Sequence, residues 1–128
     1  MAITIVRLGS TRRRGEGLRL GTVRRPPRGV PKSQFATQNW YDVWLPALAP
    51  STGLMRRTTM DESGQWWPAF AKRFEAELNK SEASRLLDVL AALSHQTNFS
   101  VGCYCAEEAR CHRSLLRRAL SDRAAVVR

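Results

Sequence analysis

The chain has 128 residues, of which 43% are hydrophobic and 25% are charged, and its formal net charge at pH 7 is +10. A chain of this length buries enough apolar surface to fold as one domain, residues 1–128, without disulfide staples. No apolar run approaches the ~20 residues that cross a bilayer. The start of the chain lacks the pattern of a signal peptide, so we expect a cytoplasmic protein with reduced thiols and no membrane partner.

The positive charge is concentrated near the N-terminus. Residues 1–32 contain nine of the 21 lysines and arginines but only one of the 11 acidic residues, Glu16. Such a field attracts phosphate-bearing partners, including nucleic acid. The same arginines would also suit an ordinary solvated surface, and composition alone leaves both interpretations open.

The pattern of the N-terminal residues predicts strands joined by loops. Residues 2–8 are apolar on both faces, as in a strand buried between layers, and residues 18–24 form a second such segment. The intervening residues 9–17 are rich in glycine and arginine and predict a loop. Three prolines between residues 25 and 31 exclude a helix or an inner strand, so a rigid loop presents Arg25 and Arg28.

Amphipathic helices dominate the second half. Ser51 is a plausible N-cap for a short helix. Apolar residues then recur at steps of three and four, which is typical of helices with one buried face. A short β-rich segment precedes the last helix. The expected elements are helices at 51–57, 63–79 and 109–120, a strand at 99–104, and a small edge strand at 124–127. A further helix is expected to follow residue 80, with Ser81 as its N-cap and a buried leucine stripe from Leu86 to Leu93.

Strands that alternate with helices predict an α/β domain. We expect a small three-layer, open and mainly parallel sheet with helices on both faces, in which residues 3–8 and 99–104 are inner strands.

All three cysteines lie within nine residues. Cys103 and Cys105 are placed at the end of the last strand and Cys111 in the first turn of the last helix, followed by His112 and Arg113. Ligands of open α/β sheets bind at this kind of place, beyond the carboxyl ends of strands and beside helix N-termini.

The cluster allows three interpretations. Cys105, Cys111 and His112 are candidate catalytic residues of a thiol site, with no cofactor required. The helix N-terminus and Arg113 would favour a thiolate at Cys111, whereas two nearby glutamates would oppose it. If Cys105 faces Cys111 across the short loop, mild oxidation should join the two as a disulfide. Cys103 could instead be a small core residue. Zinc bound by Cys103, Cys105, Cys111 and His112 has the right ligand count, although the spacing differs from that of common zinc knuckles.

Arginines supply candidate anion ligands. Arg24 and Arg28 lie on the proline-rich loop and Arg113 lies beside the cysteines, and guanidinium groups bind phosphate or carboxylate in bidentate fashion. We expect the loops that carry them to converge with Cys105 at one end of the sheet.

The Cys105-x5-Cys111-His112-Arg113 run, followed by a leucine-rich helix, resembles the YeaO-like family (Domain of Unknown Function 488), a bacterial family without an established activity. Val23 and Pro26 depart from the family pattern, which has aspartate and tryptophan there. The resemblance implies a small α/β fold. Three further segments carry it: Arg19–Lys32, Asp42–Ser51 and Trp67–Leu78.

Two functional hypotheses follow. The first is a thiol site at the end of an α/β sheet that acts on, or binds, an anionic phosphate-bearing substrate. The alternative is a non-enzymatic nucleic-acid-binding or accessory module that uses the basic N-terminal face.

Overall fold

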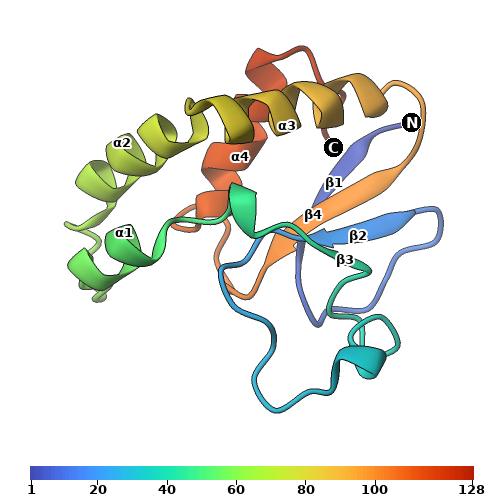
Figure 1. Cartoon of the computed structure of the whole chain (residues 1–128), viewed down its shortest axis with the longest axis horizontal. Helices are drawn as coiled ribbons and strands as arrows, with labels where there is room; N and C mark the ends of the chain where they lie inside the picture. Colours follow the sequence, from blue (N-terminus) through green and yellow to red (C-terminus); the bar gives the residue numbers. More distant parts are fainter.

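The centre of the computed structural model, which describes all 128 residues, is a parallel sheet of four strands in the order β1-β4-β2-β3 (Figure 1). The α/β class and the parallel sheet expected from the sequence are confirmed. Each strand is short, and the connections between them carry the helices and the loops that frame the site. The strands are β1 Ile3–Arg7, β2 Leu18–Gly21, β3 Val43–Trp44 and β4 Phe99–Cys103.

Strand β4 is the inner strand that the sequence predicts. All five of its residues are buried, and it pairs with β1 on one side and with β2 on the other. Strand β1, however, lies at the border of the sheet, because its outer side pairs only with the C-terminal segment. That pairing consists of a bridge between Ile3 and Val127, with bonds from the Ile3 N–H to the Val126 carbonyl and from the Arg128 N–H to the Ile3 carbonyl.

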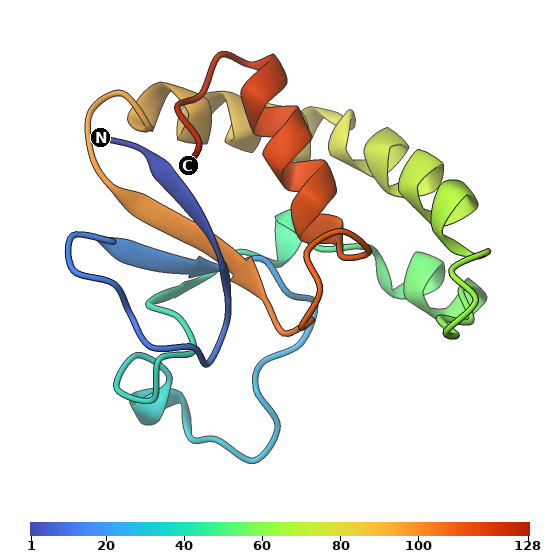
Figure 2. The same cartoon turned by 180° about the vertical axis from the view of Figure 1, so that it is seen from behind.

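The four α-helices share one hydrophobic core with the sheet. Figure 2 shows α4 crossing α3 beside the strands. Helices α2, α3 and α4 pack on one another, and α1 packs on α2. Their apolar positions at helical spacing meet Phe99 and Val101 of β4. The helices are α1 Thr52–Arg57, α2 Trp67–Leu78, α3 Ser81–Leu93 and α4 His112–Asp122, with short 3-10 helices η1 at Lys32–Gln34 and η2 at Pro46–Leu48. None of the helices has the length and apolar character of a membrane span.

A side chain caps the N-terminus of two of the four α-helices, α1 and α4. Ser51 caps α1 as expected, because its side chain accepts a hydrogen bond from the Leu54 N–H. Ser81 is the first residue of α3 and not its cap, which is Lys80. Helix α4 begins later than the sequence predicts, because Cys111 is its N-cap.

The opposite face of the sheet carries a buried ion pair. Arg19 of β2 is fully buried, and its Nε and Nη2 donate to the two carboxylate oxygens of Glu16 at 2.8 and 3.0 Å. Its Nη1 donates to the carbonyls of Ser10 and Asn39, both at 2.8 Å. Ser100 of β4 donates to the same carboxylate at 2.7 Å. The network therefore ties two loops to the two inner strands.

The carboxylate of Glu16 is held in its charged form. Burial alone would raise its pKa, but hydrogen bonds from Arg19, from Ser100 and from the Arg13 N–H lower it from 4.5 to about 2. A lowered folded-state pKa contributes stability above the unfolded value of 4.5, and this contribution is lost as the pH falls towards 2.

We predict that Glu16→Gln lowers the free energy of unfolding by about 3–5 kcal/mol at pH 7, because it leaves the buried Arg19 charge without a counterion. Urea unfolding measures the loss. The control is Asp88→Asn, which breaks the exposed pair with Arg123 and should cost less than about 1 kcal/mol. The unfolding free energy of Glu16→Gln should also fall less than that of the wild type between pH 4.5 and 2. An unchanged pH profile of the unfolding free energy would contradict this assignment.

Candidate functional site

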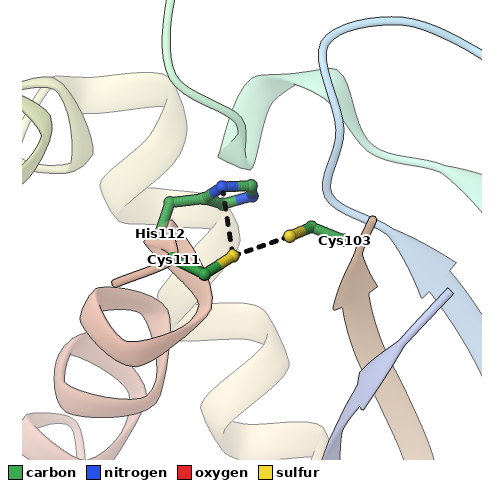
Figure 3. A group of neighbouring side chains, drawn as sticks. All are labelled: Cys103, Cys111 and His112. Carbon is green, nitrogen blue, oxygen red and sulfur yellow. Dashed lines mark hydrogen bonds between the residues drawn. The ribbon is translucent and has the colours of Figure 1, made fainter. Parts of the chain in front are cut away.

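Cys103 and Cys111 lie where β4 ends and α4 begins (Figure 3). Cys103 is the last residue of β4, and Cys111 is the residue before α4. The loop between them turns back on itself and carries Cys105 to the surface, whereas Cys103 and Cys111 are buried. The predicted position of the cluster, at the carboxyl end of the sheet beside a helix N-terminus, is confirmed.

The two buried sulfurs form a close pair. Their Sγ atoms are 2.7 Å apart, short enough for one thiol to donate its proton to the other. The Cys105 N–H donates to the Cys103 sulfur at 3.3 Å, and the Arg113 N–H points to the Cys111 sulfur at 3.5 Å. Each sulfur of the pair therefore receives one backbone N–H from the surrounding loop or helix.

His112 faces the pair as a neutral imidazole. Its Nε2 lies 2.6 Å from the carbonyl oxygen of Thr22, and a carbonyl oxygen only accepts, so Nε2 carries the proton. Nδ1 is then free to accept, 3.9 Å from the Cys111 sulfur. Burial lowers the pKa of His112 and keeps the ring neutral. The ring of Phe74 packs against it edge to face at 5.6 Å.

Arg113 lies beneath the cysteine loop. It is 4% exposed, its Nη2 donates to the Cys105 carbonyl at 2.7 Å, and its Nε has no partner. A buried guanidinium in this position holds the loop by its backbone and places a positive charge beside the thiols.

The three thiols differ in acidity. Hydrogen bonds from Cys103 and Cys111 lower the pKa of the Cys105 thiol, and the charge of Arg113 adds to this effect. Hydrogen bonds with the other two thiols, together with burial, raise the pKa of Cys103. A bond with Cys103 lowers the pKa of Cys111, but its interaction with Cys105 and burial outweigh this, and the net direction is upward.

This arrangement corrects one expectation from the sequence. A position in the first turn of the last helix, beside Arg113, would have stabilised a thiolate at Cys111. Cys111 is instead the N-cap of α4, its sulfur turns inward towards the Arg113 N–H, and the residue is only 2% exposed. The accessible thiol with a lowered pKa is Cys105.

Cys105 opens on a cavity of about 440 Å³. Met55, Met60, Trp66 and Phe70 form an apolar wall, and no acidic residue lines the cavity. We call it the thiol cavity. One wall consists of the three cysteines and His112, and the others carry Arg24, Arg25, Arg56, Arg110, Met55, Met60, Trp66 and Phe70.

Comparison with the models of known protein families identifies the family of the chain. The profile of the DUF488-N3a family, described as the active DUF488-N3 subclade, matches residues 3–124. The chain belongs to the DUF488-N3a family. Its resemblance to the YeaO-like proteins is thereby confirmed at the level of DUF488 membership. Curated proteins and solved structures give no match.

The predicted arginines of this DUF488-N3a protein all lie near the end of the sheet, but in different surroundings. Arg24 lines the thiol cavity, with its Nε and Nη2 bound to the carbonyls of Pro50 and Ala49 at 3.1 Å each. Arg28 lines a separate neighbouring cavity. Sequence reasoning missed Arg56 and Arg110. Arg110 belongs to the cysteine motif and could have been found, whereas nothing in the sequence marks Arg56 at the end of α1.

The cluster could also hold a metal ion. Cys103, Cys111 and His112 offer three ligand atoms within 4.8 Å of one another. Two sulfurs bound to one tetrahedral zinc are about 3.8 Å apart, so the pair, now 2.7 Å apart, would have to separate to accept it. The fourth ligand of the zinc hypothesis, Cys105, does not belong to this group and faces outward.

We predict that Cys105 alkylates first. At pH 6 a free cysteine is almost entirely protonated, whereas the lowered pKa of Cys105 leaves it as the reactive thiolate. Peptide mapping by mass spectrometry after brief iodoacetamide treatment should find the label on Cys105 and almost none on Cys103 or Cys111. The protein unfolded in urea serves as control, in which all three react alike. Faster labelling of Cys111 would refute the assignment.

We predict further that mild oxidation with diamide joins Cys103 to Cys111 and leaves Cys105 free, because the two buried sulfurs are already in contact. This replaces the pairing of Cys105 with Cys111 that the sequence suggested. A non-reducing peptide map identifies the linkage. A disulfide that includes Cys105 would show that the loop rearranges.

Proposed function

We propose that this DUF488-N3a protein is an enzyme in which the Cys105 thiolate attacks an anionic, phosphate-bearing substrate held in the thiol cavity. One observation carries the proposal. The only exposed thiol of the chain, Cys105, opens on a cavity that four arginines line and from which acidic residues are absent.

The arginines favour an anion. None of Arg24, Arg25, Arg56 and Arg110 forms an ion pair with a carboxylate, so their charge is available to a ligand. Guanidinium groups match phosphate oxygens in geometry and in charge. Their field would also offset the repulsion between a thiolate and an anionic substrate.

The apolar wall favours a substrate with a second, uncharged part. Trp66 and Phe70 present partly or fully buried rings whose centroids are 5.6 Å apart, edge to face, and Met55 and Met60 are exposed beside them. A molecule that joins a phosphate to a flat ring system would contact the arginines and this wall together.

The roles of the site residues follow from their contacts. Attack by Cys105 forms a bond from sulfur to the substrate, and the leaving group departs with its electron pair. Water then cleaves that bond and returns the thiolate and a proton. His112, neutral with Nδ1 towards the sulfur pair, accepts the proton that the water releases in this second step. Arg113 positions the loop and stabilises the thiolate. Arg24 contacts the anionic group in the thiol cavity, and Arg28 contacts a further anionic group in the neighbouring cavity.

A second candidate function is metal binding at Cys103, Cys111 and His112, favoured by the proximity of their three ligand atoms. Zinc there would hold the loop to the helix and leave a coordination position open. Such a metal would protect Cys111 from diamide until a chelator is added, which distinguishes it from the thiol pair. Both functions need reduced cysteines, so the proposal implies a cytoplasmic protein.

We predict that Cys105 prefers an anionic alkylating reagent. The ratio of its rate with iodoacetate to its rate with iodoacetamide should exceed that of glutathione by about tenfold at low salt, because the arginines attract the anion. Arg56→Ala combined with Arg110→Ala should reduce the ratio. Arg73→Ala combined with Arg85→Ala removes the same charge from exposed helix positions and serves as control. Inorganic pyrophosphate should slow the reaction, and a ratio equal to that of glutathione would contradict the proposal.

A further inference from the structure

A second cavity, of about 870 Å³, adjoins the thiol cavity. Three arginines and two aromatic side chains line it: Arg7 at the end of β1, Arg25 and Arg28 of the proline-rich loop, Trp40, and Tyr104 of the cysteine loop. No acidic residue is among its lining residues. We call it the basic cavity.

The charge of the basic cavity is uncompensated. The five ion pairs of the molecule use other arginines, at positions 12, 19, 117, 118 and 123. Arg7 donates only through Nε, to the Tyr104 carbonyl at 3.3 Å, so its two terminal nitrogens have no protein partner. Arg25 and Arg28 make no side-chain hydrogen bond. Of the basic N-terminal face expected from the sequence, these three guanidinium groups therefore remain available to a ligand.

The aromatic side chains are fixed in place and partly accessible. Trp40 and Tyr104 lie edge to face with ring centroids 5.9 Å apart, and both are half-buried. The Tyr104 hydroxyl donates to the Arg25 carbonyl at 2.8 Å. Trp40 packs on Gly9, where a Cβ would lie 3.0 Å from the indole ring. Rigid aromatic rings beside arginines are the means by which proteins stack unpaired bases and hold the phosphates between them.

The two cavities are neighbours, because Arg25 and Tyr104 line both. A chain of phosphates bound by Arg7 and Arg28 would pass Arg25 and reach the side of the molecule where Cys105 opens. A duplex keeps its bases stacked inside, out of reach of Trp40 and Tyr104, whereas a single strand offers bases and phosphates together.

We infer that the basic cavity binds single-stranded nucleic acid and leads it to Cys105. The inference rests on the proposed function for the chemistry at Cys105, and it adds the class of substrate. Binding in the basic cavity itself depends on the arginines and aromatic rings and requires no reaction.

Fluorescence anisotropy with a labelled single strand of about ten nucleotides tests the binding. Arg7→Ala combined with Arg28→Ala should weaken binding by tenfold or more, because each substitution removes a charge-assisted bond to the strand. The slope of log affinity against log salt should flatten by about 0.7 for each phosphate that the variant no longer neutralises. Arg73→Ala combined with Arg85→Ala removes equal charge elsewhere and should change the affinity little.

Trp40→Leu tests stacking without a change of charge and should weaken binding roughly tenfold. Equal losses of affinity in both arginine pairs, or an unchanged affinity in Arg7→Ala with Arg28→Ala, would overturn the inference. So would a duplex or a mononucleotide that binds as tightly as the single strand.

A last measurement separates this inference from the proposed function. The bound strand should slow alkylation of Cys105 by the neutral reagent iodoacetamide, and full reactivity at saturating strand would overturn the path to Cys105. If the strand binds and protects but iodoacetate shows no preference, the inference stands and the proposed function fails. If iodoacetate is preferred but no strand binds, the inference alone fails.

Discussion

Strand β2 carries a guanidinium into the interior of the protein, and the loops around it are arranged to meet its N–H groups. Burying an unpaired charge costs several kcal/mol, so Arg19 requires the Glu16 carboxylate and the two carbonyls that it contacts. The loops that carry this carboxylate and these two carbonyls are therefore held in fixed positions. Ser10 and Trp40, the neighbour of Asn39, both line the basic cavity, and the buried charge thus fixes the geometry of a surface feature.

The thiol cluster depends on a different constraint. A strand that ends at Cys103 and a helix that begins after Cys111 bring two sulfurs into contact, and the loop between them turns the third sulfur outward. The buried pair is held in mutual contact and the third thiol is exposed, so one short segment produces thiols of opposite accessibility. Arg113 and His112, both contributed by the first turn of α4, set the charge and the proton acceptor around this segment.

The sequence pattern was sufficient to predict β4, the apolar faces of α2 and α3, and the position of the cysteines. The strand and the helix faces follow from local periodicity. The position of the cysteines follows because the sites of parallel sheets lie beyond the carboxyl ends of the strands. Arg19 shows where such reasoning ends. In a short alternating strand it reads as a surface residue, and its burial depends on Glu16, Ser10 and Asn39, which only the folded loops bring together. The inward turn of Cys111 likewise follows from its capping role, which the sequence pattern did not predict.

The parallel sheet also separates the ends of the chain from the cavities. Strand β1 begins beside the C-terminal segment, with the Arg128 N–H bound to the Ile3 carbonyl at 2.9 Å, and the two termini lie close together in both views (Figures 1 and 2). Every strand runs from that end towards the cysteines. A dye, a surface tether or an additional folded unit joined at either terminus would lie at the end of the sheet opposite the cysteines and leave both cavities open. Because the two termini are adjacent, the chain could also be inserted into a surface loop of another protein without separating the two ends of that loop.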